Sequence, residues 1–192
     1  MTPLSHRHQL SIGLTLILLM VLTRGQHLSL VGYVPDASWA VFFLAGIYLR
    51  PVWALPAYMI VALVLDIAAV TWGGVSGFCI SPAYFMLVPA HAFLWGAGRW
   101  CRRAHRNVFS TLLNLSVAVL LSSALAELFS SGGFYLFSGR FADLSLAEMS
   151  SRFLTYYPFS LEALTLYVGM AVMVHAVVMF AAGKHLGRVT GG

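Results

Sequence analysis

Hydrophobic residues occur in long runs along this chain, and short breaks with Gly, Pro and single charges separate the runs. The strict apolar–polar alternation of half-buried strands is absent, so the pattern favours helices. A bilayer core of about 30 Å takes about 20 helical residues to cross. The runs predict six membrane-spanning helices, at approximately residues 9–31, 36–50, 52–72, 81–100, 108–130 and 158–184.

Two regions need separate interpretation. The run 36–50 is short for a span, but Pro35 and Arg50-Pro51 bracket it, so we retain it. Residues 131–157 mix charged residues with aromatic ones, which predicts an outer loop carrying a short amphipathic helix at the interface. No repeat or long linker divides the chain. We therefore predict one membrane domain over residues 1–192, an all-α bundle of six transmembrane helices.

The N-terminal segment has some features of a signal peptide. His6-Arg7-His8 precedes the apolar residues 10–23, as a charged region precedes the apolar region of a signal peptide. The following residues, Arg24-Gly25-Gln26-His27, lack a small-x-small cleavage pattern. We therefore expect this segment to be retained as the first span.

Composition supports an integral membrane protein. Of 192 residues, 60% are hydrophobic and only 9% are charged, far from the average of soluble domains. The excess of 11 Lys+Arg over 6 Asp+Glu could indicate nucleic-acid binding. In a membrane protein it is explained more simply by basic residues kept on the cytoplasmic side. We expect a lipid bilayer around the chain and no nucleic-acid partner.

The basic residues predict the orientation. With six spans and the N-terminus inside, eight basic residues lie at cytoplasmic ends and three lie outside, which favours an N-in, C-in topology. The cytoplasmic set is Arg7, Arg50, Arg99, Arg102, Arg103, Arg106, Lys184 and Arg188. All six acidic residues then fall in the outer half or in outer loops.

This topology gathers several polar side chains from different spans and loops at the outer face. They are His27, Asp66, Cys79, Tyr84, Glu127, Arg152 and Glu162. Asp66 is the clearest case, because residues 61–70 hold no other polar side chain. An ionisable group in hydrocarbon costs at least about 2.5 kcal/mol and usually faces a cavity or a partner. Aromatic residues crowd the same region, which favours a cavity for a large, flat, partly apolar ligand.

Each of these residues also has a structural interpretation. Asp66 could be a partner for Arg24, and His27 could be an interfacial residue. Arg152 could contact solvent or lipid headgroups, and Tyr84, which follows Pro82 at a helix start, could serve packing alone.

Cys79 lies in a glycine-rich break, Trp72-Gly-Gly-Val-Ser-Gly-Phe-Cys-Ile-Ser-Pro-Ala-Tyr84. A thiolate in such a loop is a soft ligand for transition metals, although a free cysteine often packs as a small hydrophobe. The other cysteine, Cys101, follows about 30 Å further along a helix. A disulfide needs Cα atoms within about 7 Å, so the two cannot pair within one molecule. We interpret Cys101 as structural.

Motifs for other chemistry are absent from the sequence. It contains no Walker loop, no GxGxxG, no HExxH and no CxxC. We therefore expect no nucleotide cofactor, and active transport would need another protein or a downstream sink.

Several of these features resemble a known family. The segments Val34-Pro-Asp-Ala-Ser-Trp39 and Gly77-Phe-Cys-Ile-Ser-Pro-Ala-Tyr84, with isolated His27, Asp66 and Arg152, resemble the BtuM family of small bacterial cobalamin transporters. That family is related to the substrate-binding S-components of energy-coupling factor (ECF) vitamin transporters. The resemblance covers most of the chain, and the cysteine loop is its most specific part.

The resemblance implies a function and a site. It implies uptake of cobalamin (vitamin B12) across the bacterial cytoplasmic (inner) membrane by a multi-pass protein with an outward-facing cavity. Cys79 would be the axial ligand of the cobalt in cobalamin, the bound substrate, and would promote decyanation of cyanocobalamin as its catalytic residue. His27, Asp66, Tyr84 and Arg152 would complete the substrate-binding site.

The chain departs from the pattern of ECF S-components in one feature that concerns its partners. S-components that dock on the shared ECF energising module usually carry Ala-x-x-x-Ala on the first span, whereas residues 10–23 contain no alanine. This argues against an ECF partner and for solitary action, and no pattern identifies a periplasmic donor. Three alternatives remain open: an S-component for another vitamin, a membrane thiol enzyme with Cys79 as nucleophile, and an assembly subunit without a ligand.

Overall fold

The computed structural model describes residues 5–24, 34–73, 77, 81–104 and 108–189. Within these residues every regular element is helical, which confirms the predicted all-α class. The longer helices are α1 (His6–Arg24), α2 (Ser38–Tyr48), α3 (Ala54–Thr71), α4 (Leu87–Arg103), α5 (Val108–Glu127) and α7 (Leu146–Val189). The shorter ones are the 3₁₀ helix η2 (Pro82–Met86), the π-helical turn η3 (Leu128–Gly132) and α6 (Gly133–Phe137).

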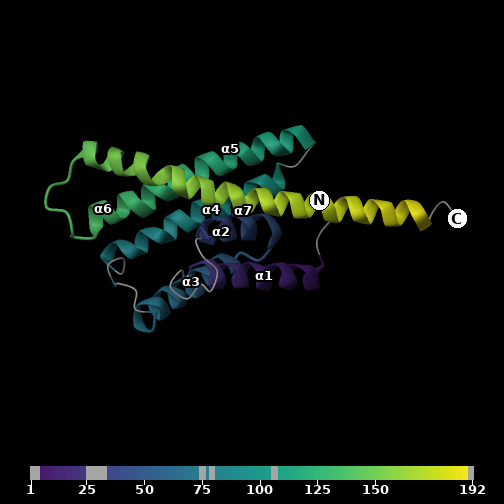
Figure 1. Ribbon diagram of the computed structural model, residues 1–192, viewed down its shortest axis with the longest axis horizontal. Helices are drawn as coiled ribbons and strands as arrows, with labels where there is room; N and C mark the ends of the chain where they lie inside the picture. The colour runs from purple at the N-terminus through teal and green to yellow at the C-terminus, as the bar shows by residue number, and fades with distance from the viewer. Residues whose placement is uncertain (1–4, 25–33, 74–76, 78–80, 105–107, 190–192) are drawn as a thin grey trace.

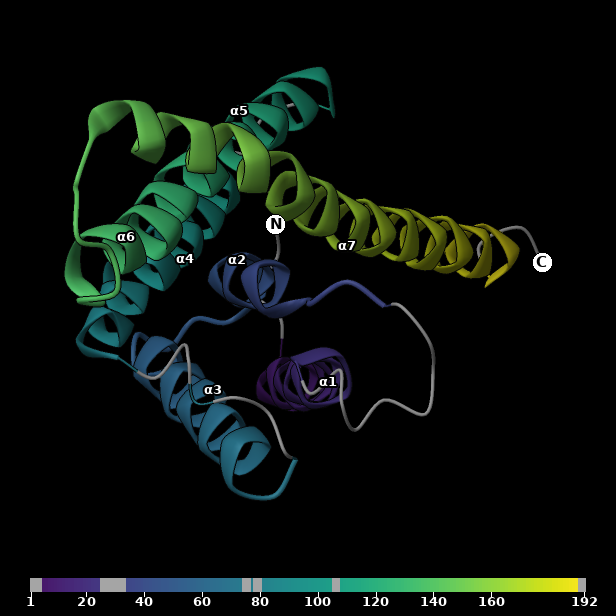
Figure 2. The ribbon, with the colours of Figure 1, turned by 60° about the vertical axis from the view of Figure 1, so that its left-hand side comes forward.

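The long helices lie roughly along one axis of the molecule (Figure 1). The start of α1 and the end of α7 point toward the same end, and the connection from α6 to α7 lies at the other end. The C-terminal part of α7 extends away from the other helices in both ribbon views (Figures 1 and 2).

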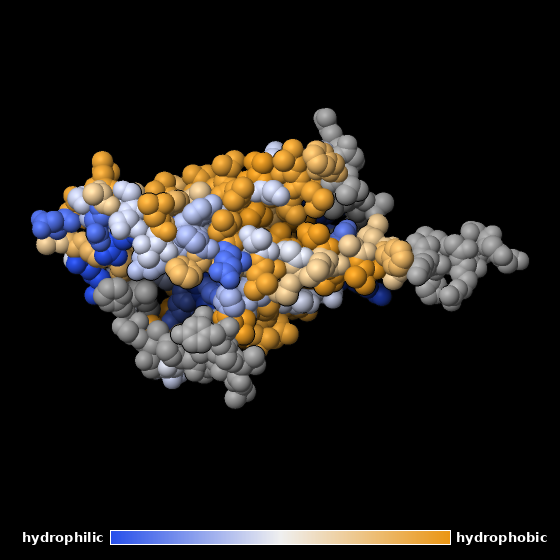
Figure 3. All heavy atoms as spheres, turned by 45° about the horizontal axis from the view of Figure 1, so that its top comes forward, coloured by the Kyte–Doolittle hydropathy of each residue, from blue (hydrophilic) through white to orange (hydrophobic). Residues whose placement is uncertain are grey.

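Three helical segments of the described residues are long and apolar enough to cross a membrane. They are Ala54–Thr71, Phe109–Phe137 and Leu146–Ala181. On the face drawn in Figure 3, hydrophobic atoms cover much of the middle, whereas hydrophilic atoms gather at the end that carries α6. This distribution indicates a membrane protein, because an apolar surface of this extent is unfavourable in water.

The other predicted spans differ from these three. Helix α2 has 11 residues, about 16 Å of helix, which is too short for a core of about 30 Å. Neither α1 nor α4 combines the length and hydropathy of the three segments. The described residues therefore support three membrane-spanning helices, whereas the sequence predicts six.

Residues 131–157 are more helical than expected for an outer loop. The helix of α5 continues through η3 and α6 to Phe137, and α7 already begins at Leu146. Pro158, the expected start of the last span, lies inside α7. A proline in a helix removes one backbone hydrogen bond. In α7 the helix continues on both sides of that position.

Helix α2 forms the centre of the bundle. Its side chains from Ala40 to Ala45 are almost completely buried, as expected for a helix that is apolar on all sides. It packs directly on α4 because glycines allow the two backbones to approach. A Cβ atom on Gly46 would lie 2.1 Å from the carbonyl oxygen of Trp95, and one on Gly98 would lie 2.0 Å from that of Phe43. Small residues at such contacts are typical of membrane helices.

Candidate functional site

Asp66 on α3 lies in a hydrogen-bonded cluster with Arg24 and Tyr84. Arg24, the last residue of α1, donates from Nε to Asp66 Oδ1 at 2.6 Å and from Nη2 to Oδ2 at 2.7 Å. Tyr84 in η2 donates its hydroxyl proton to Asp66 Oδ2 at 2.7 Å. The side chains of Arg24 and Asp66 are only 13% and 25% exposed. A bidentate guanidinium–carboxylate pair of this kind is strong and fixes the orientation of both groups.

The same arginine connects this cluster to the start of α2. Arg24 Nη1 donates to the hydroxyl of Ser38 at 2.7 Å, and it lies 3.9 Å from Asp36 Oδ2. Asp36 Oδ1 accepts hydrogen bonds from the hydroxyl of Ser38 at 2.7 Å and from its backbone N–H at 2.9 Å. We call Arg24, Asp36, Ser38, Asp66 and Tyr84 the polar cluster. It joins α1, α2, α3 and η2 by charge and hydrogen bonding.

Two residues, Ser38 within this cluster and His91 near it, were not predicted from the sequence as site residues. Ser38 falls in the segment Val34-Pro-Asp-Ala-Ser-Trp39, but its side chain was not singled out there. His91 on α4 is 3% exposed, and its ring stacks on Phe42 with centroids 3.9 Å apart. His91 is also within electrostatic reach of Arg24 and Asp66. In the sequence, the only signal for His91 is a titratable side chain within a mainly apolar helical run.

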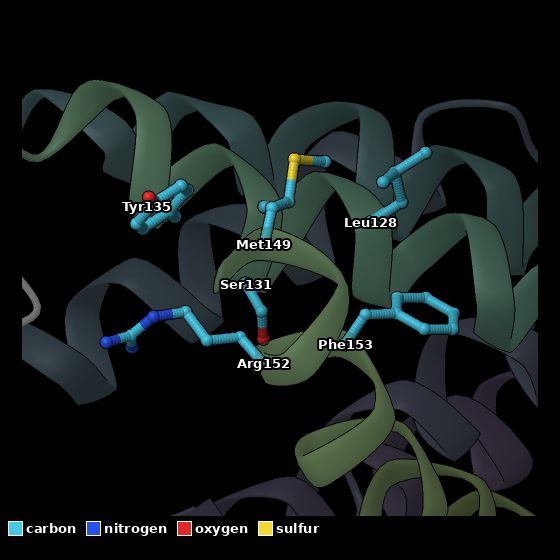
Figure 4. A pocket seen from close by; sticks show the side chains of 7 residues that line it. Leu128, Ser131, Tyr135, Met149, Arg152 and Phe153 are labelled. Atoms are coloured by element: carbon cyan, nitrogen blue, oxygen red, sulfur yellow. The ribbon is translucent and has the colours of Figure 1, made fainter. Parts of the chain in front are cut away.

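Arg152 lies elsewhere, near the start of α7. Its Nε is 2.9 Å from Oε1 of Glu148, one helical turn earlier. The guanidinium group also lies 4.4 Å from the ring centroid of Phe141 and 5.5 Å from that of Tyr135. Figure 4 shows Arg152 and Phe153 extending in opposite directions from α7, with the guanidinium group on the side of Tyr135. Cation–π contacts and the ion pair thus hold Arg152 at one wall of a cavity.

That cavity has a volume of about 470 Å³. Its lining residues are Ser130, Ser131, Phe134, Phe141, Arg152 and Tyr156. A second cavity of about 10 Å³, room for about one water molecule, shares Ser131 and Arg152 with it, and this small cavity is the one drawn in Figure 4. The larger one is a half-open hollow whose volume falls within the usual size range of ligand pockets, about 300–1,000 Å³, and its wall combines three aromatic rings with two serines and one arginine. We call it the aromatic cavity.

The structure therefore brings together some of the predicted site residues. Asp66 and Tyr84 are in direct contact, and Arg152 lines the aromatic cavity apart from them. His27 and Cys79 lie outside the described residues, so their predicted roles remain predictions. Among the described residues, no group of three or more His, Cys, Asp or Glu side chains is arranged to hold a metal ion.

The polar cluster also bears on the structural interpretation of Asp66. Both carboxylate oxygens already accept hydrogen bonds, and Arg24 neutralises the charge. The contact with Arg24 that the sequence left open as an alternative is therefore present. A ligand role for Asp66 would have to use the remaining acceptor capacity of these two oxygens.

The fold and these cavities together define a class of protein. It is all-helical, with helices long and apolar enough to span a membrane, a polar cluster that ties four elements together, and an aromatic cavity with one arginine. No family model and no curated protein matches the chain in comparison.

Proposed function

We propose that this protein binds a solute in the aromatic cavity and moves it across a bacterial cytoplasmic membrane, and that the solute is cobalamin. The observation that supports a binding function best is the aromatic cavity itself, of about 470 Å³ with Arg152 in its wall. Aromatic faces suit the flat face of a macrocycle, and a guanidinium group suits amide oxygens or a phosphate.

The choice of cobalamin is supported by the sequence resemblance to the BtuM family. Under this proposal all six predicted spans, including the short α2, form the membrane bundle, with both termini in the cytoplasm. The common direction of the start of α1 and the end of α7 in Figure 1 suits such a topology.

A corrinoid with its nucleotide loop is larger than the aromatic cavity. The proposal therefore includes an enlargement of the cavity when the ligand binds. The polar cluster would bound the enlarged site, with Asp66 and Tyr84 as hydrogen-bonding groups and His27 as a further contact.

Cys79 carries the proposed chemistry. Its thiolate donates an electron pair to cobalt(III) and becomes an axial ligand, since soft sulfur donors suit transition metals. With cyanocobalamin, the cobalt–carbon bond then breaks and cyanide leaves with the bonding pair, so cobalt keeps its oxidation state. Removal of cyanide would draw uptake forward without an ATP-driven partner.

The test uses the purified protein mixed with cyanocobalamin, and it follows the visible absorption of the corrinoid. We expect the intact protein and a Cys101→Ala variant to shift the spectrum equally. A Cys79→Ala variant should leave the spectrum of the free vitamin unchanged. A full shift with Cys79→Ala would remove the thiolate from the mechanism.

The same measurement separates the main alternative, a transporter of a different vitamin. That function would use the aromatic cavity without sulfur chemistry. It predicts no spectral change in any variant and no binding of the corrinoid.

A further inference from the structure

Glu127 is a carboxylate buried inside an apolar helical segment. It ends α5, lies within the membrane-length segment Phe109–Phe137, and is 2% exposed. The ion pairs found among the described residues join Arg24 to Asp36 and Asp66, and Arg152 to Glu148, so none neutralises Glu127. Burying an ionised group without an opposite charge is costly, and an ionisable residue at membrane depth is by default a candidate functional site.

Among the described residues, the hydrogen-bond donors to this carboxylate are two hydroxyl groups. The hydroxyl of Ser131, on the next turn, donates to Glu127 Oε1. The hydroxyl of Ser160, on α7, donates to Glu127 Oε2 at 2.7 Å. Side-chain oxygens from two helices thus meet at one buried point. Oxygen ligands of this type are those that hard cations prefer.

A second observation concerns the backbone at the same place. Residues Leu128–Gly132, directly after Glu127, form a π-helical turn. Such turns are rare and often occur at functional sites. In membrane transporters, interrupted helices supply oxygen atoms for Na⁺ or H⁺ near the middle of the bilayer. The irregular turn and the buried acid coincide within one segment.

We propose that Glu127, Ser131 and Ser160 form a binding site for one monovalent cation, Na⁺ or H⁺. One positive charge balances the single carboxylate, whereas a divalent ion would leave a net charge in the apolar interior. The serine hydroxyls turn their oxygen lone pairs to Na⁺, or keep their hydrogen bonds when the carboxyl group carries a proton.

The position of Ser131 gives this site a role in transport. Ser131 contacts Glu127 and also lines the aromatic cavity. A cation at Glu127 is therefore one side chain away from the candidate solute. The site would couple a cation gradient to the protein, which encodes no ATP-binding motif of its own. This inference does not depend on the identity of the solute.

Other titratable groups lie on the elements packed against this site. They include His91 on α4, Tyr135 on α6, and Glu148, Arg152, Tyr156, Tyr157 and Glu162 on α7. Any response to pH must therefore be compared between the intact protein and a variant that lacks only the Glu127 carboxylate. Glu127→Gln keeps the shape of the side chain and removes its charge.

The experiment measures thermal unfolding of the purified protein in detergent, without any corrinoid. One arm replaces choline chloride by NaCl at constant pH and ionic strength, and the other lowers the pH without Na⁺. We expect the unfolding midpoint of the intact protein to rise in one arm. The rise should be about 3 °C when Na⁺ is tenfold above its Kd. Glu127→Gln should abolish the response, and the exposed control Glu162→Gln should retain it.

Ser160→Ala provides a second measurement in case Glu127→Gln does not fold. It removes one oxygen ligand from α7 and should raise the Na⁺ concentration needed for half of the response at least about tenfold. In the pH arm, the carboxylate loses a hydrogen-bond donor that stabilises its ionised form, so half of the response should move to higher pH. A Na⁺ response would identify a sodium site and a pH response a proton site, and either supports the proposal. It is overturned if the intact protein responds in neither arm, or if its response persists in Glu127→Gln or is unchanged in Ser160→Ala.

Discussion

Asp66 illustrates how a charged residue is accommodated inside an apolar helix. Its carboxylate accepts two hydrogen bonds from Arg24 and one from Tyr84, at 2.6–2.7 Å. Removing one member of a largely buried pair leaves the other charge without compensation, which costs more than the pair contributes as a whole. Substitution of Asp66 should therefore destabilise the folded protein through Arg24, a contact that the sequence left open as an alternative.

We expect Asp66→Asn to lower the free energy of unfolding by about 2 kcal/mol, because the Arg24 guanidinium group loses its main counter-charge. Tyr84→Phe should cost about 1 kcal/mol, the value of one hydrogen bond. Unfolding in detergent, followed by circular dichroism, measures both. Asp143→Asn, in the exposed connection to α7, is the control and should change little. Equal stability of Asp66→Asn and the control would contradict the importance of the polar cluster.

Arg152 allows binding to be separated from stability. Its ion pair with Glu148 is partly exposed, with side chains 31% and 49% accessible, and such pairs contribute about 0–1 kcal/mol. We expect Arg152→Gln to weaken binding of cyanocobalamin at least about tenfold, or about 1.4 kcal/mol, while the unfolding midpoint stays close to that of the intact protein. Titration calorimetry measures the affinity, and Arg140→Gln is the matched control. Unchanged affinity would place the ligand outside the aromatic cavity.

At the scale of elements, α2 and α4 pack with their backbones in close approach. The absence of side chains at Gly46 and Gly98 permits it, since an added Cβ would overlap a backbone carbonyl of the facing helix. Backbone atoms cannot move aside as the end of a flexible side chain can. The short helix α2 is therefore held in the centre of the bundle by shape as well as by its apolar character.

Gly98→Ala should destabilise the protein by about 1–3 kcal/mol, because the new methyl group forces α2 and α4 apart. Gly96→Ala, on the same helix, should be neutral or slightly stabilising, because no atom lies within 4 Å of its added Cβ and alanine favours helix. The two variants are compared by thermal unfolding in detergent. Similar midpoints for both would show that the helices are further apart than described.

The elements also show how far the sequence predicts structure. Each of the six apolar runs contains a helix, since continuous apolar character over many residues leaves few alternatives in a bilayer. Their ends were less predictable. Residues 131–137 and 146–157 are helical although charges and aromatic residues suggested a loop, because contacts of α6 with η2 and of α7 with η3 support them.

For the whole molecule, the N-in, C-in topology is a prediction from the distribution of basic residues. It can be tested with single cysteines in a background that carries Cys79→Ala and Cys101→Ala. We expect Ala142→Cys, between α6 and α7, to react with a membrane-impermeant maleimide applied outside intact cells. Arg7→Cys, at the start of α1, should react only after the membrane is permeabilised. The opposite pattern of labelling would invert the topology and turn the aromatic cavity toward the cytoplasm.

The sequence by itself determined that this chain is all-helical and apolar enough for a membrane, because hydrophobic runs of this length specify helices locally. It also singled out Asp66, Tyr84 and Arg152 as polar residues in unusual positions. Only the tertiary structure decided the partners of the buried carboxylates: Arg24 reaches Asp66 across 42 positions of the chain, and Ser160 reaches Glu127 across 33. Such contacts depend on how whole helices pack, and no local pattern of residues encodes that packing.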